Sequence, residues 1–268
     1  MRISYFCTTW GQKNEGWDAF FRKVKNAGYD GIETSQPQKG EEREFLDSLN
    51  YYQLEFIAQH WETSTVDFEA HKEEYTERIQ LLAELKPLFI NSHTGKDHFS
   101  FEQNIALLNI AANKANETAV PIYHETHRGR FAFAAHKTRP FLERSPAPEL
   151  TLDVSHWCNV AESLLQDQTE ALNLALNQTR HIHARIGFEQ GPQVPDFTLP
   201  QYQESLQFHL ECWDKIVLNH KKNDRAMLPI TTEFGPPSYM QVISKGDAYK
   251  KQWKLNEDMM NLLKGRYS

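Results

Sequence analysis

The feature of this sequence that most constrains its fold is a regular alternation of short strand-like runs and amphipathic helical stretches. Between the runs, apolar residues recur at helical spacing, as in Trp17, Phe20, Phe21 and Val24. Strands that alternate with helices predict a parallel sheet. The strand-like runs are Arg2–Trp10, Tyr29–Ser35, Leu54–Trp61, Leu88–His93, Val120–Glu125, Leu150–Val154, Arg180–Ile186 and Met227–Phe234.

The number of these units predicts a closed barrel. About eight strand-plus-helix units in a chain of 268 residues match the size of a single-domain (β/α)8 TIM barrel spanning residues 1–268. Ser100 followed by Gln103 has the pattern of a helix capping box, which supports the count. An open doubly wound sheet would carry a glycine-rich phosphate turn after the first strand, but residues 8–13 have no such pattern and no Walker A motif occurs.

Charged and imidazole side chains stand at the ends of several predicted strands. Charged residues are normally excluded from buried strands, so each of them needs an explanation. In a barrel the carboxyl ends of all strands converge on one face, so these side chains are expected to be neighbours. The four that form the central set are Glu125, Asp153, His183 and Glu233.

This central set, called the metal set below, predicts a site for one divalent metal ion. Three carboxylates and an imidazole brought together without a cation would repel each other and stay desolvated. A ligand set rich in oxygen with one imidazole suits Mn²⁺, Mg²⁺ or Co²⁺, and Zn²⁺ is also compatible. A lone glutamate or aspartate at a strand end is more often a helix cap or a salt-bridge partner, so the prediction depends on their recurrence at successive strand ends.

Three residues near this set are further candidates. His156 follows Asp153 by three positions, and we interpret it as a supporting or substrate-binding imidazole, with a helix-capping histidine as the alternative. Arg185 shares the strand parity of the metal set and could bind a substrate oxygen or form a salt bridge at the rim. His181 has the same parity one layer deeper and is expected to be a buried, hydrogen-bonded histidine.

Strand ends elsewhere add possible substrate contacts. His60 and His93 end the third and fourth strands at positions that correspond to the metal set. Trp10, Trp61 and Trp157 lie at or just beyond strand ends, where an indole could stack on the apolar face of a sugar. Packing in the core or at the rim is the alternative for the tryptophans.

At these motifs the chain resembles the xylose isomerase-like TIM barrels. The matching segments are Tyr-His-Glu-Thr-His-Arg around Glu125, Leu-Asp-Val-Ser-His-Trp around Asp153, His-Ile-His at His183 and Thr-Thr-Glu-Phe-Gly around Glu233. The family includes sugar epimerases of the D-tagatose 3-epimerase type, sugar phosphate isomerases, inosose dehydratases and DNA repair enzymes of the endonuclease IV type. The resemblance implies a metal on the four residues, a substrate contact from His156, and two catalytic glutamates, Glu125 and Glu233, that flank the reacting carbons.

The resemblance implies a metal-dependent sugar isomerase or epimerase that transfers a proton next to a carbonyl through an enediolate. A keto-sugar or inosose dehydratase or lyase on the same site is the main alternative, and a non-catalytic sugar-binding barrel is another. The epimerases have an arginine several residues beyond the strand-seven histidine, whereas the corresponding stretch here runs Arg185-Ile186-Gly187-Phe188-Glu189 and departs from that pattern. The repair enzymes need an Asp-x-His after strand seven, which the loop 191–197 lacks.

Composition restricts the partners and the setting. The formal net charge of −7 argues against a nucleic-acid ligand, so a small sugar or keto-sugar is the expected partner. Cys7, Cys158 and Cys212 are scattered and odd in number, which indicates reduced thiols and a cytoplasmic location. No signal peptide or membrane span is expected.

The loop Gly187–Pro200 is expected either to cover the substrate or to be a plain surface loop. The oligomeric state is left open, a homo-oligomer included.

Overall fold

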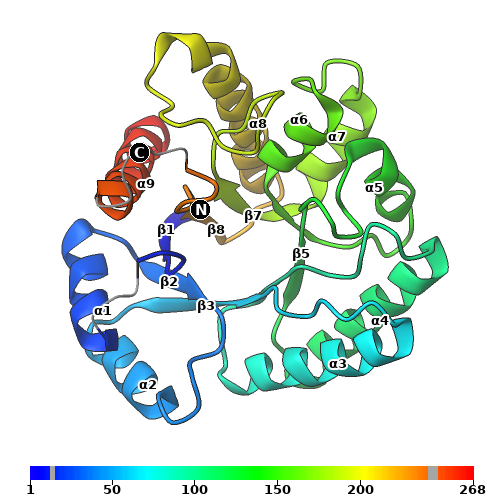
Figure 1. The fold of residues 1–268 in the computed structure, drawn as a ribbon, viewed down its shortest axis with the longest axis horizontal. Helices are drawn as coiled ribbons and strands as arrows, with labels where there is room; N and C mark the ends of the chain where they lie inside the picture. The colour runs from blue at the N-terminus through cyan, green and yellow to red at the C-terminus, as the bar shows by residue number, and fades with distance from the viewer. Residues whose placement is uncertain (13–15, 241–246) are drawn as a thin grey trace.

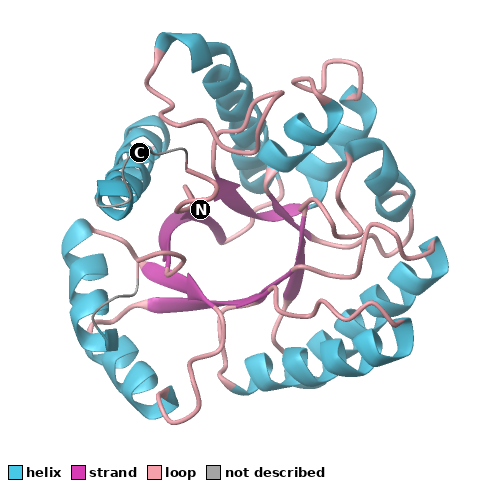
Figure 2. Ribbon diagram, in the orientation of Figure 1, coloured by secondary structure: helices cyan, strands magenta, loops and turns pink. Residues whose placement is uncertain are grey.

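The computed structural model describes residues 1–12, 16–240 and 247–268, and it confirms the predicted (β/α)8 TIM barrel. Eight parallel strands pair in chain order, and β8 closes the barrel against β1 (Figures 1 and 2). All eight predicted runs contain a strand. The strands are β1 Arg2–Thr8, β2 Gly31–Thr34, β3 Glu55–His60, β4 Ile90–Ser92, β5 Ile122–Glu125, β6 Leu150–Leu152, β7 Thr179–Ala184 and β8 Met227–Thr232.

Helices form a ring outside the strands (Figure 2). Figure 1 shows α9 beside α1, and the ammonium of Lys23 lies 3.6 Å from the centre of the Trp253 ring between these two helices. The sixth unit carries two helices in place of the single one expected. The helices are α1 Gly16–Ala27, α2 Glu42–Tyr51, α3 Phe68–Glu84, α4 Phe101–Thr118, α5 Ala135–Leu142, α6 Val154–Ala161, α7 Thr169–Gln178, the short 3₁₀ helix Pro200–Tyr202, α8 Gln203–Lys222 and α9 Ala248–Tyr267.

Strand parity separates the main core from the barrel interior. In β7, Ile182 and Ala184 point outward and pack in the large apolar core beneath the helices. The alternate residues, His181 and His183, point inward, because successive side chains of a strand face opposite sides. Inward-pointing residues that are two apart along a strand, such as His181 and His183, therefore belong to two successive layers of the barrel interior.

Two local motifs fix where helices begin beside the barrel. The capping box at α4 is confirmed: Ser100 accepts from the backbone N–H of Gln103, and the Gln103 side chain accepts from the Ser100 N–H. Asp153 caps α6 by accepting from the backbone N–H of Ser155. This carboxylate is therefore held in place by the start of its own helix.

The lower part of the barrel interior is sealed by apolar side chains. Phe6, Ile57 and Phe89 form a separate cluster and are at most 2% exposed. Gly31 makes room for this cluster, because a Cβ at that position would lie 2.5 Å from the Phe6 ring and 2.3 Å from the carbonyl oxygen of Glu55. The interior is thus closed below the carboxyl ends of the strands.

The loop Gly187–Pro200 packs on the barrel and does not line the cavity described below, as far as the described residues extend. Its Val194 and Phe197 are buried, and the Gln193 side chain exchanges two hydrogen bonds with the backbone of Gly235. The expectation that this loop covers the substrate is therefore not supported. Among the helices of the described residues, none has both the length and the apolar character needed to cross a membrane.

Candidate active site

The structure brings the central set together at the carboxyl ends of β5 to β8. Each of Glu125, Asp153, His183 and Glu233 offers one ligand atom, and these four atoms all lie within 4.8 Å of one another. Glu125 is the last residue of β5, Asp153 and Glu233 directly follow β6 and β8, and His183 lies in β7. Four segments that are far apart in the chain thus contribute to a single cluster, as the strand-end pattern predicted.

The four residues lie at two depths below a cavity of about 460 Å³. Glu125 and Glu233 line this cavity, whereas Asp153 and His183 are fully buried beneath it. The two glutamates are therefore the members of the set that a bound molecule would meet.

Arg185 supplies a positive charge inside the cluster. Its guanidinium donates a short hydrogen bond to Asp153 Oδ2 and lies 3.5 Å from Glu233 Oε2, and the residue is only 1% exposed. Burial opposes the charge of this guanidinium, but Asp153 and Glu233 outweigh burial and raise the pKa of Arg185. Arg185 lines the cavity as well, so it joins the carboxylate cluster to the space where a ligand would bind. Arg185 does form the salt bridge that the alternative prediction gave it, but the ion pair is buried and does not lie at the rim.

His183 is surrounded by carboxylates. Its Nδ1 lies 2.9 Å from Glu233 Oε2 and 3.6 Å from Glu125 Oε1, while Nε2 lies 3.0 Å from Glu33 Oε2. Burial disfavours the imidazolium, but Glu233, Glu33 and Glu125 together raise the pKa of His183 well above its ordinary value. The cluster therefore attracts a cation at this position.

His93 contacts the metal set through Glu125. Its Nε2–H donates to Glu125 Oε2 at 2.8 Å, and its ring stacks on His127 at 4.4 Å. Burial would raise the pKa of Glu125, but His93 and His183 outweigh burial and hold that pKa well below its ordinary value. Both imidazoles line the cavity, so a substrate contact from His93 stays a prediction that this position allows.

His156 contributes indirectly. It is fully buried, its Nε2 accepts from Arg185 Nη2 at 2.9 Å, and the ring of His127 lies 4.0 Å away. Burial, His127 and Arg185 hold the pKa of His156 well below its ordinary value, so its imidazole is neutral. The structure thus places His156 behind Arg185, and the substrate contact implied by the resemblance is replaced by a supporting contact.

Two predicted substrate contacts are wrong. His60 points outward with Ala58, not into the barrel, and its two nitrogens lie 3.2 Å from Ser92 Oγ and 2.7 Å from Thr63 Oγ1. Trp157 is fully buried in α6, where its indole N–H donates to the carbonyl oxygen of Ala132. Both side chains are therefore parts of the packing around the barrel.

Aromatic side chains form the outer wall of the cavity. Trp10, Trp61 and Tyr239 line it, and the Trp61 side chain is half-exposed at its mouth. Trp10 packs edge-on against Tyr239 with ring centres 4.9 Å apart. Trp10 thus lies where sequence analysis expected it, and Tyr239 is a wall residue that sequence analysis missed.

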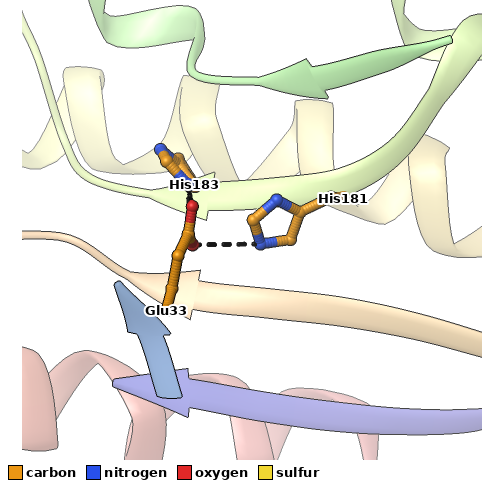
Figure 3. Close-up of side chains that lie close together, drawn as sticks. All are labelled: Glu33, His181 and His183. Carbon is orange, nitrogen blue, oxygen red and sulfur yellow. Dashed lines mark hydrogen bonds and ion pairs between the residues drawn. The ribbon is translucent and has the colours of Figure 1, made fainter. Parts of the chain in front are cut away.

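Glu33 is the most informative residue that sequence analysis missed. It lies in β2, is 1% exposed, and contacts His183 beneath the cavity (Figure 3). The signal that could have found it is the one used for the metal set, a carboxylate near the end of a predicted strand. His181 matches its expectation as a buried, hydrogen-bonded histidine, between the hydroxyls of Thr151 and Thr231.

The donor set fits a divalent cation. His183 Nδ1 is buried and, despite its short distance to Glu233, has no partner with hydrogen-bond geometry among the described residues. The nearby carboxylate oxygens of Glu125, Asp153 and Glu233 complete a mixed oxygen and nitrogen set. Without a metal, the raised pKa of His183 favours a proton on this nitrogen, and a divalent cation that displaced the proton would take its place among the carboxylates.

Comparison with known proteins adds evidence on the fold. No family model and no curated protein sequence matches the chain. The D-allulose 3-epimerase from Methylomonas sp. superposes with a TM-score of 0.63 at 18% identity, covering 99% of this chain and 98% of that one. The probable 3-DHS dehydratase AsbF from Bacillus anthracis gives 0.61 at 18%, covering 97% and 98%. A xylose isomerase domain protein from Salmonella typhimurium gives 0.62 at 11%, covering 97% and 99%.

These structural neighbours include one described as an epimerase and one described as a probable dehydratase. At 18% identity or less, the similarity concerns the fold, and the resemblance expected from the strand-end motifs is confirmed at that level. The chain has the fold of the xylose isomerase-like TIM barrels.

Proposed function

We propose that this chain is a divalent-metal-dependent sugar isomerase or epimerase that transfers a proton next to a carbonyl. The observation that carries the proposal is the convergence of three carboxylates and one imidazole at the floor of an aromatic-walled cavity. A pure binding site has no need for two cavity-facing glutamates in one metal-binding group. The proposal therefore assigns catalysis to Glu125 and Glu233.

The metal would be held by Glu125, Asp153, His183 and Glu233. Mn²⁺, Mg²⁺ and Co²⁺ are the preferred ions, and Zn²⁺ is the alternative. When bound, the ion would polarise the carbonyl of the substrate and stabilise the negative charge of the enediolate.

The two glutamates would move the proton. One of them, Glu125 or Glu233, would remove the proton from the carbon next to the carbonyl, and the other would return it. Return to the opposite face of the same carbon gives epimerisation, and return to the neighbouring carbon gives isomerisation. Glu125, which accepts a hydrogen bond from His93, is ionised, as a proton acceptor must be.

The remaining cavity residues would bind the sugar. Trp10, Trp61 and Tyr239 offer aromatic faces to the apolar face of a sugar ring. Arg185 would donate a hydrogen bond to a substrate oxygen while its other contacts hold it against Asp153. A small sugar or keto-sugar is therefore the proposed substrate.

Metal analysis tests this proposal directly. The purified protein should contain about one divalent ion per chain, and a chelator should abolish turnover in a panel of ketoses and keto-sugars, with recovery when Mn²⁺ or Co²⁺ is restored. A protein that binds no divalent ion would contradict the proposal. A metal-loaded protein that is inert against the whole panel would instead indicate a binding barrel.

A dehydratase or lyase acting on a keto-sugar or inosose is the second candidate, since the same glutamates can serve an elimination. The position of Arg185 favours it, because a guanidinium at the cavity floor can hold the oxygen of a leaving hydroxyl. Solvent deuterium in a retained C–H bond would indicate isomerisation or epimerisation, whereas an enone chromophore would indicate elimination.

The cellular location of the protein is also a proposal. Cys7, Cys158 and Cys212 are all buried and unpaired, which fits the reducing, cytoplasmic location expected from the sequence. Size measurements in solution would establish whether the chain forms a homo-oligomer.

A further inference from the structure

Glu33 is a buried carboxylate that the proposed chemistry does not use. It lies in β2, two residues beyond Gly31, so strand parity directs it into the barrel interior. A charged carboxylate at 1% exposure is stable only when donors satisfy it. The donors around Glu33 therefore indicate its role.

Three side chains donate to the Glu33 carboxylate. Asn91 Nδ2 donates to Oε1 at 2.8 Å, Thr231 Oγ1 donates to Oε2 at 2.6 Å, and His183 Nε2 lies 3.0 Å from Oε2. Figure 3 shows the carboxylate between His183 and His181, and the longer contact to His181 is 3.7 Å. The strongest link from Glu33 to the metal set is thus through His183.

These contacts determine which nitrogen of His183 carries hydrogen. An ionised carboxylate only accepts hydrogen bonds, so Glu33 requires a hydrogen on His183 Nε2. Asn91 also lies 3.2 Å from this Nε2, but its two amide hydrogens point to closer acceptors, Glu33 Oε1 and Glu125 Oε2 at 2.7 Å. Nε2 therefore keeps its hydrogen for Glu33, so Nδ1 is the nitrogen that would give up its proton to a bound cation and offer its lone pair.

The geometry points to Glu33 as a positioning residue, which holds the His183 ring so that Nδ1 faces the ion bound by Glu125 and Glu233. This inference rests on the proposed metal site. A carboxylate on the second nitrogen of a ligating imidazole fixes its tautomer and makes it a stronger ligand. Asn91 extends the arrangement, since its amide joins Glu33 to Glu125 and so couples two ligands to one buried carboxylate.

The test compares Mn²⁺ affinity in the wild type and in Glu33→Gln by isothermal titration calorimetry. Glutamine has the same shape without the charge, so we expect Mn²⁺ affinity to fall by roughly 10- to 100-fold. Thr151→Val is the matched control, because it removes a buried interior hydroxyl that contacts His181 but neither Glu33 nor His183. The control should bind Mn²⁺ as the wild type does.

Nuclear magnetic resonance of the Zn²⁺-loaded protein gives a second measurement. The ¹⁵N shifts of His183 should show a single Nε2–H form in the wild type and in Thr151→Val, and a mixture of forms in Glu33→Gln. If Glu33→Gln does not fold, Glu33→Asp keeps the charge but is too short to reach His183, and it should weaken Mn²⁺ binding in the same way.

The possible results separate the two proposals. A folded Glu33→Gln protein with unchanged Mn²⁺ affinity and an unchanged His183 form would overturn the positioning role and leave the metal site intact. A wild-type protein that binds no Mn²⁺, Co²⁺ or Zn²⁺ would overturn the proposed function, and the positioning role with it. Equal losses in Glu33→Gln and Thr151→Val would show a general packing effect and also overturn the positioning role.

Discussion

The same strands build two layers of opposite chemistry inside the barrel. The lower layer contains Phe6, Ile57 and Phe89, which are packed together and sealed from solvent. The upper layer contains the metal set with Glu33, Asn91 and Arg185, which hydrogen bonds and ion pairs hold together. In several strands the two layers are only two residues apart, as with Gly31 and Glu33 in β2 or Phe89 and Asn91 at β4.

Because of this difference, residues of one strand contribute to stability in the lower layer and to the proposed activity in the upper layer. Apolar packing in the lower layer stabilises the fold, because each buried side chain removes apolar surface from water. The upper layer places charges in a buried region, which is unfavourable unless a cation and hydrogen-bond donors balance them. Substitutions in the two layers should therefore affect different measurements.

The largest effect should come from Glu233→Gln. Glutamine cannot accept the proton, so we expect kcat to fall by roughly 1,000-fold, which corresponds to about 4 kcal/mol in the activation barrier. A ketose should still bind, which titration calorimetry would measure. Glu149→Gln is the control, since Glu149 pairs with Arg180 and does not line the cavity. Retained turnover in Glu233→Gln would remove this residue from proton transfer.

Phe6→Ala should have the opposite effect to Glu233→Gln: it should lower stability and leave metal binding intact. Truncating this fully buried ring leaves a cavity in the lower layer, so we expect the free energy of unfolding to fall by about 3–5 kcal/mol. Denaturant titration measures this loss, and the remaining folded protein should keep its metal affinity. Tyr51→Ala at a 78% exposed position is the control and should change stability little. A large loss of metal affinity in folded Phe6→Ala would show that the layers are not independent.

The smallest effect concerns a buried polar group outside both layers. His209 in α8 donates from Nδ1 to the carbonyl oxygen of Ser205 and accepts from the backbone N–H of Gly187. Burial is the main cause that lowers the pKa of His209 from 6.5 to about 4, the Ser205 carbonyl partly offsets it, and the charge of Arg185 adds to the lowering.

The sign of the pH effect follows from this shift. As pH falls from 6.5 to 4, the unfolded chain takes up a proton at His209 before the folded chain does, so folding loses up to about 3 kcal/mol. The contribution is fully present above pH 6.5. Denaturation of the wild type and of His209→Gln across this range should show the shallower pH dependence in the variant. Identical slopes would mean that the folded protein protonates His209 normally.

Sequence patterns were sufficient to predict the fold and the convergence of the four side chains at the proposed metal site. Eight strand-like runs were enough to predict the barrel, because each run carries the composition of a buried strand and each is followed by a helical period. The metal set followed because all parallel strands of a barrel end on one face. Glu125 and Glu233 could be placed without knowing any side-chain direction.

Side-chain direction explains what the sequence did not show. His60 ends a strand as His93 does, but it has the parity of Ala58, so it faces the helices. Trp157 follows a strand end closely, yet the helix begins at Val154 and carries the indole into the core. Glu33 was accessible to the same reasoning, but its partners come from β4, β7 and β8, and only the closed barrel brings them together.

The apolar floor formed by Phe6, Ile57 and Phe89 has a kinetic consequence. Because these side chains pack together below the cavity, the reactant and product of the proposed reaction would both pass on the side of the half-exposed Trp61. A departing product would delay the entry of the next reactant, and both would bind against the same cavity walls. Steady-state analysis should therefore give purely competitive product inhibition, with reactant and product excluding each other.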